Sequence, residues 1–314
     1  MNPYWDKNFF QVFMIFFQRM VQGFPNMASD EVQILVLSLV AVSTGLLGVF
    51  LVLKKMTMLA NSLSHTILLG IVLAFVFLGA QVLNFEVLFV AAFISALVTT
   101  LLTQFLTHTI RLQEDASIGL VFTSLFALGV VCVTALTRSS HIGIEAVMGN
   151  VDALHITDLK LIGIIACINI GVFTLFFKEF QLTTFDSVLA KVLGISPTLF
   201  NYLIMILVAM TSIGAFRAVG VLLVLAFLVG PALTARLLTN RLKPLLFLAC
   251  AIGIFSSLCG VALSRHILST WHISLSTAGL IVTLIALVYG LTLVYTLRKR
   301  SGTHAGTGTK EEKV

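Results

Sequence analysis

The sequence has 314 residues, of which 59% are hydrophobic and 10% are charged, and its mean hydropathy is +1.08. A soluble domain needs about a quarter of its residues charged to cover its surface, so the composition excludes a soluble enzyme. The net charge of +6 does not indicate nucleic-acid binding, because the basic residues lie between apolar runs instead of gathering on one face. The composition predicts an integral membrane protein.

Nine apolar runs are each long enough to cross a hydrocarbon layer of about 30 Å as a helix. The alternating pattern of membrane strands is absent from the sequence. We therefore predict an all-α fold, a polytopic membrane helix bundle of about nine transmembrane helices, within a range of eight to ten. The predicted spans are residues 30–53, 58–79, 85–107, 116–137, 156–177, 198–215, 218–238, 245–264 and 274–297.

The N-terminal residues 1–29 have a different pattern from the spans. Their apolar run is interrupted by polar residues such as Gln18 and Arg19, which is typical of a helix that lies along the membrane interface. A tenth crossing is the alternative. We predict an interfacial segment over 1–29, a transmembrane permease domain over 30–297 and a polar, disordered cytoplasmic tail over 298–314.

The basic residues of the loops predict the orientation. Eleven Lys and Arg residues lie on one side of the predicted topology and four on the other, if the N-terminal segment is left out. Cytoplasmic loops carry the excess of Lys and Arg, so the richer side and the C-terminus are predicted to be cytoplasmic. The eleven are Lys54, Lys55, Arg111, Lys178, Lys191, Arg236, Arg241, Lys243, Arg298, Lys299 and Arg300.

The second predicted span contains polar residues, which are costly in lipid. Asn61 and His65 are four residues apart, so a helix places both on one face. An amide oxygen and a neutral imidazole can both coordinate a divalent cation, and we consider the pair as metal contacts. The alternative is that both side chains form hydrogen bonds between helices, as polar residues in membrane bundles commonly do.

The longest predicted cytoplasmic loop is residues 178–197. Asp186 and the residues before it form an N-cap signature ahead of a short amphipathic segment, and Gly194 and Pro197 end that segment. A small helix below the membrane is a natural docking element for another protein. A connecting turn is the alternative.

Other acidic residues have a structural interpretation. Glu114 and Asp115 open the fourth span, where carboxylates favour the first turn of a helix. An external loop over 138–158 could attract cations, but an ordinary solvated loop competes with this interpretation. Its candidates are His141, Glu145, Asp152, His155 and Asp158.

The sequence lacks the motifs of several enzyme classes. It contains no GxxxxGK[ST] phosphate loop, no HExxH and no GxSxG. We therefore predict that the chain is not an enzyme, does not bind ATP by such a loop and binds no cofactor.

Five blocks of sequence occur in an order that is typical of one family. They are KKM with NSLSHTILLG up to residue 70, EDASIG at 114–119, MGN at 148–150, the loop from KE at 178 to Gly194, and AVGVLL through PALTAR at 218–236. On these blocks the chain resembles the permease subunits of ABC-type importers for zinc, manganese and iron.

This resemblance implies a division of labour between subunits in a bacterial plasma membrane. Two permeases form the pathway, a cytoplasmic ABC ATPase dimer drives it, and an extracytoplasmic binding protein delivers a divalent metal ion as the transported substrate. The 185–196 helix would seat on the ATPase through Phe185, Asp186, Ala190 and Gly194. Asn61 and His65 fall where the family has a pore-lining Asp and His.

The sequence departs from the family's pattern at two positions. Asn61 replaces the carboxylate and Leu69 replaces a proline before Gly70. An amide binds a dication more weakly than a carboxylate does, so we hypothesise that the chain pairs with a different, carboxylate-bearing permease. Two alternatives for the function stay open: an ion-coupled secondary transporter, and an ABC permease for a metal chelate.

Overall fold

The computed structural model describes residue 4 and residues 9–22, 27–78, 85–137 and 151–305. Within these ranges every regular element is a helix, and the predicted all-α membrane bundle is confirmed. The helices are α1 Phe9–Val21, α2 Ser29–Leu53, α3 Thr57–Leu78, α4 Phe85–His108, α5 Glu114–Thr137, the 3-10 turn η2 Val151–Ala153, α7 Ile156–Leu175, α8 Phe177–Phe185, α9 Ser187–Val192, α10 Pro197–Val219, α11 Val221–Leu238, α12 Leu242–Trp271 and α13 Thr277–Ala305.

Eight of the described helices are long and apolar enough to cross a membrane. In addition, the 22-residue helix α3 coincides with the predicted span 58–79. The predicted spans thus correspond to helices in chain order, as expected for lipid-crossing segments whose backbone groups must be paired internally.

The ends of three elements differ from the prediction. Residues 177–185 form the helix α8, where we expected a loop. The helix α12 extends about a turn or more beyond the predicted span 245–264 at either end, and α13 continues beyond the predicted span 274–297 to Ala305. Hydropathy marks where a helix leaves the lipid, whereas hydrogen bonding continues at little cost once a helix has formed.

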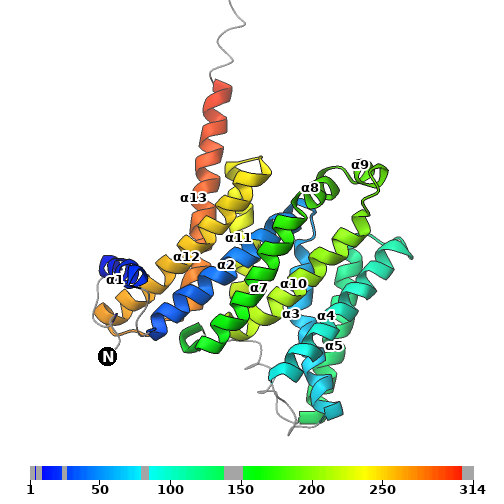
Figure 1. The fold of residues 1–314 in the computed structure, drawn as a ribbon, viewed down its shortest axis with the longest axis horizontal. Coiled ribbons are helices and arrows are strands. Elements are labelled where there is room, and N and C mark those ends of the chain that lie inside the picture. The colour runs from blue at the N-terminus through cyan, green and yellow to red at the C-terminus, as the bar shows by residue number, and fades with distance from the viewer. Residues whose placement is uncertain (1–3, 5–8, 23–26, 79–84, 138–150, 306–314) are drawn as a thin grey trace, which may run out of the picture.

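The helix α2 lies at the centre of the bundle and packs against α7, α10, α11 and α12. Figure 1 shows α1, α12 and α13 at one end of the molecule, α3, α4 and α5 at the other, and α2, α7 and α10 between them. The group of α3, α4 and α5 joins the rest mainly through α10.

Glycines allow α2 to approach its neighbours closely. A Cβ added to Gly48 would lie 1.9 Å from the carbonyl oxygen of Leu228 in α11, and one added to Gly253 in α12 would lie 3.0 Å from the Cβ of Ala41. Small residues at such contacts let helix backbones pack tightly in a membrane. The helices α2, α11 and α12 therefore form the tightly packed part of the bundle.

The start of α2 carries acidic side chains that are buried. Asp30 and Glu31 are 1% and 0% exposed. Asp30 forms an ion pair with Arg265 of α12, and Glu31 forms one with Arg19 of α1. We call these four residues together with Tyr4, whose hydroxyl donates to Glu31 at 3.0 Å, the α2 clamp. Opposite charges buried together offset much of their desolvation cost.

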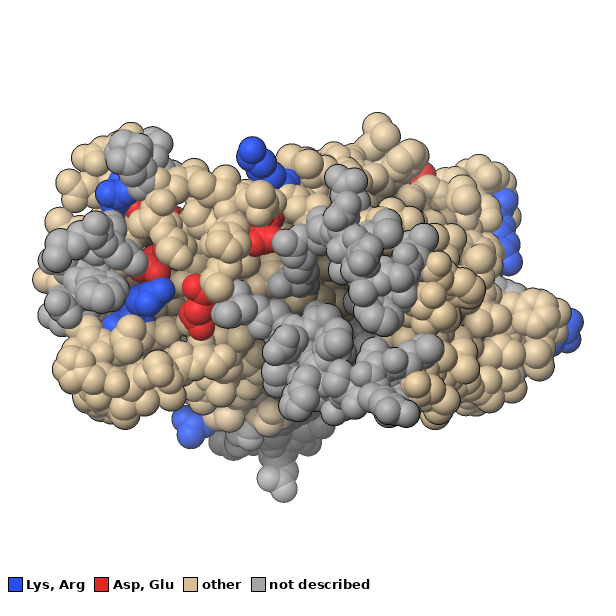
Figure 2. All heavy atoms as spheres, turned by 90° about the horizontal axis from the view of Figure 1, so that it is seen from below, with Lys and Arg blue, Asp and Glu red and all other residues tan. Residues whose placement is uncertain are grey.

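A second polar contact continues from the clamp. Gln33 of α2 donates to Asp152 of η2 at 3.0 Å, and Thr277 of α13 donates to the same carboxylate at 2.6 Å. Figure 2, which looks onto the end of the molecule that is lowest in Figure 1, shows acidic and basic side chains next to one another over part of this face. The start of α2 is thus tied to α1, η2, α12 and α13.

Candidate functional site

Asn61 and His65 lie in the first half of α3, one helical turn apart. Their side chains lie outside the described residues, so the backbone and the neighbouring positions define their surroundings. Ser62 and Thr66 are buried, and the carbonyl of Thr66 accepts a hydrogen bond from Ser95 of α4 at 2.7 Å. Ser62 and Thr66 therefore mark the strip that faces α4, and Asn61 and His65 lie about 100° around the helix from it.

The position of α3 is fixed by Gly70. A Cβ at this position would lie 2.5 Å from the carbonyl oxygen of Ala91 and 2.6 Å from the Cβ of Ser95. No side chain fits between the two helices there. Backbone contact with α4 thus holds the strip of α3 that carries Asn61 and His65 at a defined place.

A stripe of hydroxyl groups along α4 was missed by the sequence interpretation. Ser95, Thr99 and Thr103 are buried, and Thr99 and Thr103 each donate to the carbonyl four residues earlier at 2.8 Å. Their spacing of four could have revealed the stripe. Thr99 and Thr103 are paired within their own helix, and Ser95 is paired with α3, so the three hydroxyls form a buried polar surface beside α3 without needing a ligand.

Gln104 continues this stripe toward α10. It is 3% exposed and donates to the sulfur of Met205 at 3.3 Å, while its oxygen has no hydrogen-bond partner among the described residues. The described residues contain no group of three or more His, Cys, Asp or Glu side chains that could hold a metal ion. The metal contacts of Asn61 and His65 therefore stay a prediction.

The helix α8 is anchored to the bundle by one buried ring. Phe180 is 0% exposed. Its ring centroid lies 5.6 Å from that of Phe50 in α2, 4.9 Å from Phe173 in α7 and 5.1 Å from Phe200 in α10. Aromatic contacts of this kind stabilise packing beyond the area that they bury. Phe180 thus connects α8 to three transmembrane helices.

The short helix α9 has the ends that the sequence predicts. The carboxylate of Asp186 accepts hydrogen bonds from the backbone N–H groups of Val188 and Leu189 at 3.1 and 2.9 Å, as an N-cap does. Ala190 is fully buried. Gly194 adopts a φ of 80°, which favours glycine, and ends the segment. These residues shape and seat the helix.

The outer face of α9 is apolar. Phe185, Val188, Leu189, Val192 and Leu193 are all exposed, with Val188 at 72% and Val192 at 78%. Figure 1 shows α8 and α9 together at the upper edge of the molecule, at the same end as the C-terminal part of α13. A contiguous exposed apolar face of this kind marks an interaction site.

The acidic residues of the predicted external loop have structural partners. Asp152 joins η2 to α2 and α13 through the hydrogen bonds described above. Asp158 accepts from the backbone N–H of His155 at 3.0 Å at the start of α7, and is a capping residue. His141 and Glu145 lie outside the described residues. The helix α5 begins at Glu114, which agrees with the capping interpretation of Glu114 and Asp115.

The order of the helices and the position of α8 and α9 agree with one family. The sequence profile described as "ABC 3 transport family" matches residues 31–296. The chain belongs to this family. It is a multi-pass membrane subunit of an ABC transporter, and the matched region covers the bundle from the start of α2 to the last part of α13.

Individual members of the family are similar over most of their length. A probable metal transport system membrane protein of Chlamydia trachomatis is 39% identical over 304 residues, which cover 96% of each chain. The manganese transport system membrane protein MntD of Bacillus subtilis is 35% identical over 270 residues, or 82% of this chain and 88% of its relative. A structure of PsaBC from Streptococcus pneumoniae in complex with Fab superposes with a TM-score of 0.70 at 26% identity, covering 88% of this chain and 95% of that chain.

Proposed function

We propose that the chain is the permease subunit of an ATP-driven importer of divalent transition-metal ions, with manganese as the first candidate and zinc and ferrous iron as the others. The observation that carries this proposal is the 35% identity with a manganese transport system membrane protein over 82% of the chain. Histidine and oxygen ligands suit all three ions, so the choice between them needs a measurement.

The pathway that we propose runs beside the strip of α3 that carries Asn61 and His65. A neutral imidazole and an amide oxygen offer two ligands to a passing cation. Two neutral ligands hold a dication weakly, and weak binding is what a permease requires, because the ion must leave as readily as it enters.

The force for transport reaches the bundle through α8 and α9 in this proposal. A cytoplasmic ATPase dimer binds the apolar face that includes Val188, Leu189 and Val192, which are exposed in the subunit alone. The ring of Phe180 contacts α2, α7 and α10. ATP binding and hydrolysis then move α8 and α9, and this motion switches the side to which the pathway opens.

Asn61 bears on the composition of the complex. Family members have a carboxylate at the matching position by the resemblance described above, and an amide leaves this subunit without that negative charge. We propose that a second, carboxylate-bearing permease completes the pathway as a heterodimer, and that an extracytoplasmic binding protein delivers the ion. Purification of an active complex that contains copies of this chain alone would refute the heterodimer.

We propose that the N-terminal segment lies along the lipid–water interface on the external side of the plasma membrane. The helix α1 packs on α12 through buried Val12 and Phe16, while Phe10, Met14 and Phe17 are exposed. An apolar face of this size suits the boundary between head groups and acyl chains. The region 298–314 would lie in the cytoplasm.

Transport by reconstituted vesicles tests the proposal. The vesicles contain the chain with its partner permease and ATPase, and uptake of radiolabelled manganese, zinc and iron is followed with and without ATP. We expect uptake of at least one ion to depend on ATP. Uptake that continues without any ATPase, driven by a proton or sodium gradient, would refute the proposal.

The variant His65→Ala tests the proposed pathway. We expect uptake to fall about tenfold while the ATPase still co-purifies, because the change removes one ligand and leaves α8 and α9 intact. His266→Ala is the matched control, since His266 lies near the outer end of α12. Unchanged uptake by His65→Ala would leave His65 with a packing role alone.

A further inference from the structure

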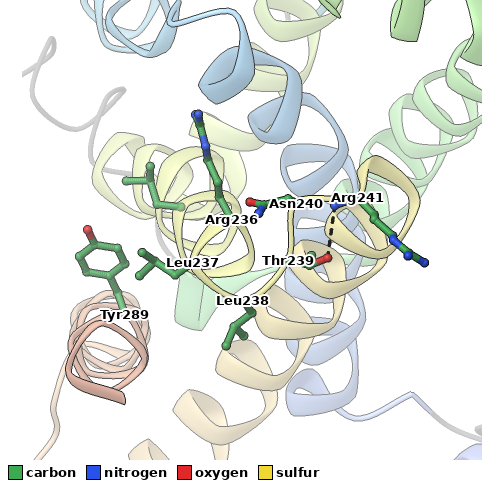
Figure 3. Close-up of a pocket in the computed structure, with 8 residues that line it drawn as sticks. Arg236, Leu237, Leu238, Thr239, Asn240, Arg241 and Tyr289 are labelled. Carbon is green, nitrogen blue, oxygen red and sulfur yellow. Dashed lines mark hydrogen bonds between the residues drawn. The ribbon is translucent and has the colours of Figure 1, made fainter. Parts of the chain in front are cut away.

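A pocket of about 650 Å³ lies where α11 ends and α12 begins, beside α13. Its polar lining consists of Arg236, Thr239, Asn240, Arg241 and Tyr289. Figure 3 shows Tyr289 on α13 facing Leu237 of α11, with Arg236 and Asn240 next to one another at the end of α11, and the side chain of Arg241 pointing away on the other side of the turn. The pocket thus presents guanidinium, amide and hydroxyl groups from separate elements.

The charge of this pocket is positive and unbalanced. Its lining contains two arginines and no carboxylate, and in the described part of the chain neither arginine forms an ion pair. Arg236 makes one long contact, from a guanidinium nitrogen to the carbonyl of Val52 at 3.5 Å, although a guanidinium carries five N–H donors. The group that fits this arrangement is a phosphate, which arginine recognises better than any other anion except carboxylate.

The rest of the lining is apolar. Leu233, Leu237 and Leu238 lie on the side of α11 that the pocket covers. The neighbouring α13 is little buried along its membrane-spanning part, 11% of which lies inside the protein, so the pocket is next to a helix whose apolar surface is open to lipid. A pocket that is lined by both hydrogen-bond donors and leucines fits an amphiphile better than a free anion.

The position of the pocket indicates which leaflet of the membrane it faces. The turn between α11 and α12 lies at the end of the bundle that carries α8 and α9 (Figure 1), which the distribution of Lys and Arg predicts to be cytoplasmic. Basic pockets between transmembrane helices on this side bind the head groups of anionic lipids, and tyrosine is enriched at head-group depth.

We propose that this pocket binds the phosphate ester head group of an anionic phospholipid from the cytoplasmic leaflet. Arg236, Asn240 and Tyr289 contact the phosphate, Arg241 adds positive charge at the rim, and the three leucines contact the first part of an acyl chain. A lipid bound here joins the α11–α12 turn to α13. The site is separate from Asn61, His65 and the apolar face of α9, so it goes beyond the transport function.

Thermal unfolding of the purified, delipidated transport complex tests this proposal. The melting temperature is measured against increasing phosphatidylglycerol in mixed micelles, with phosphatidylcholine and inorganic phosphate in parallel. We expect phosphatidylglycerol to raise the melting temperature saturably and phosphatidylcholine not to raise it. Arg236→Gln should weaken the apparent affinity about fivefold, Arg241→Gln by the same factor or less, and the double variant by about twentyfold.

Lys243→Gln is the matched control. It removes the same charge from the start of α12, next to the turn, but Lys243 does not line the pocket and its Nζ lies 5.9 Å from the ring centroid of Phe177. An equal loss of affinity in Lys243→Gln and Arg236→Gln would overturn the proposal, because it would indicate a general effect of charge.

Three further outcomes would also overturn the proposal. Equal shifts by the two lipids would show that the head group is not recognised. A full shift by inorganic phosphate would make free phosphate the ligand and exclude the lipid as its source. Loss of the co-purifying ATPase in Arg236→Gln, with no response of the wild type to phosphatidylglycerol, would assign the pocket to a protein contact.

Discussion

The two ends of the bundle differ in how their side chains are paired and buried. At the start of α2, Asp30 and Glu31 are buried and paired with Arg265 and Arg19 from other helices. At the other end, α9 buries Ala190 and exposes a row of large apolar side chains. The buried carboxylates at the first end are paired within the chain, whereas the second end exposes an apolar surface of the kind that marks an interaction site.

This difference indicates where the subunit needs a partner. The α2 clamp consists of long-range ion pairs, which we expect to contribute to the stability of the isolated subunit. The helix α9 is instead held by its local caps and follows α8, whose residue Phe180 packs against the bundle. Substitutions in the clamp should therefore change stability, and substitutions on the outer face of α9 should change assembly. The four predictions below test that separation, from the largest expected effect to the smallest.

The largest effect is expected for Arg265→Met. This variant removes the guanidinium that forms an ion pair with the buried carboxylate of Asp30, and removal of one member of a buried pair costs about 3 kcal/mol. We expect a clear fall in the melting temperature of the purified complex. Lys160→Met, which removes an exposed cation at the start of α7, is the control. An equal melting temperature for Arg265→Met and the wild type would show that the clamp is not a source of stability.

Val188→Asp should separate assembly from stability. The side chain is 72% exposed, so the charge is tolerated by the subunit alone, but it would be desolvated against an ATPase at a cost of about 2 kcal/mol. We expect about thirtyfold less co-purified ATPase and an unchanged melting temperature of the permease. Ser187→Asp, at the exposed neighbouring position, is the control. Normal co-purification from Val188→Asp would remove α9 from the interface.

Asp186→Ala is expected to have a smaller effect. It removes the acceptor of two backbone hydrogen bonds at the start of α9, and loss of an N-cap costs about 1 kcal/mol. Hydrogen exchange of the α9 amides should become about fivefold faster, with little change in the transmembrane helices. Asp186→Asn, which keeps an acceptor oxygen, should restore most of the protection. Equal exchange in the alanine variant would contradict the capping role.

The smallest effect concerns alkaline pH. Burial, together with the hydrogen bond to Glu31 and its negative charge, raises the pKa of Tyr4 above its ordinary value of 10.0. The folded state then holds the phenolic proton more tightly than the unfolded state does. The stabilisation that this gives to the folded state is complete below the ordinary pKa of 10.0 and is lost as the pH rises through the raised pKa. Tyr4→Phe should cost about 0.5 kcal/mol at neutral pH, because Glu31 keeps its other partners.

The measurement for Tyr4→Phe is the difference in melting temperature between wild type and variant at about pH 8 and about pH 11. This difference should shrink or reverse at the higher pH. A constant difference would show that the phenol of Tyr4 does not titrate with folding.

The sequence predicts the membrane bundle well because hydropathy and loop charge are local signals. It also predicts the N-cap of α9, since Asp186, the amides that it pairs with and Gly194 are close in sequence. The α2 clamp could not be predicted in this way. Asp30 and Arg265 are 235 positions apart, so no local pattern reveals that they pair. The missed helix α8 depends on Phe180, whose partners come from three distant helices.

The candidate site was likewise predictable from the sequence only where its signals are local. The spacing of Asn61 and His65 places both on one face of α3, but the strip that faces α4 is defined by Gly70 and the Ala91 carbonyl. Contact between two backbones leaves no local pattern in either segment. The pocket beside Tyr289 likewise combines α11, α13 and a turn, and its two arginines were assigned to the cytoplasmic loops by charge alone.

The contact of Gly48 with Leu228 limits how the subunit can change shape. With a Cβ position only 1.9 Å from the facing carbonyl, α2 and α11 have no side chain between them at this crossing that could re-pack as one helix slid along the other. We therefore expect these two helices to move as one body in a conversion between outward-open and inward-open states. Helices must then slide past one another at a different contact, and the looser junction between α10 and the group of α3, α4 and α5 is such a contact.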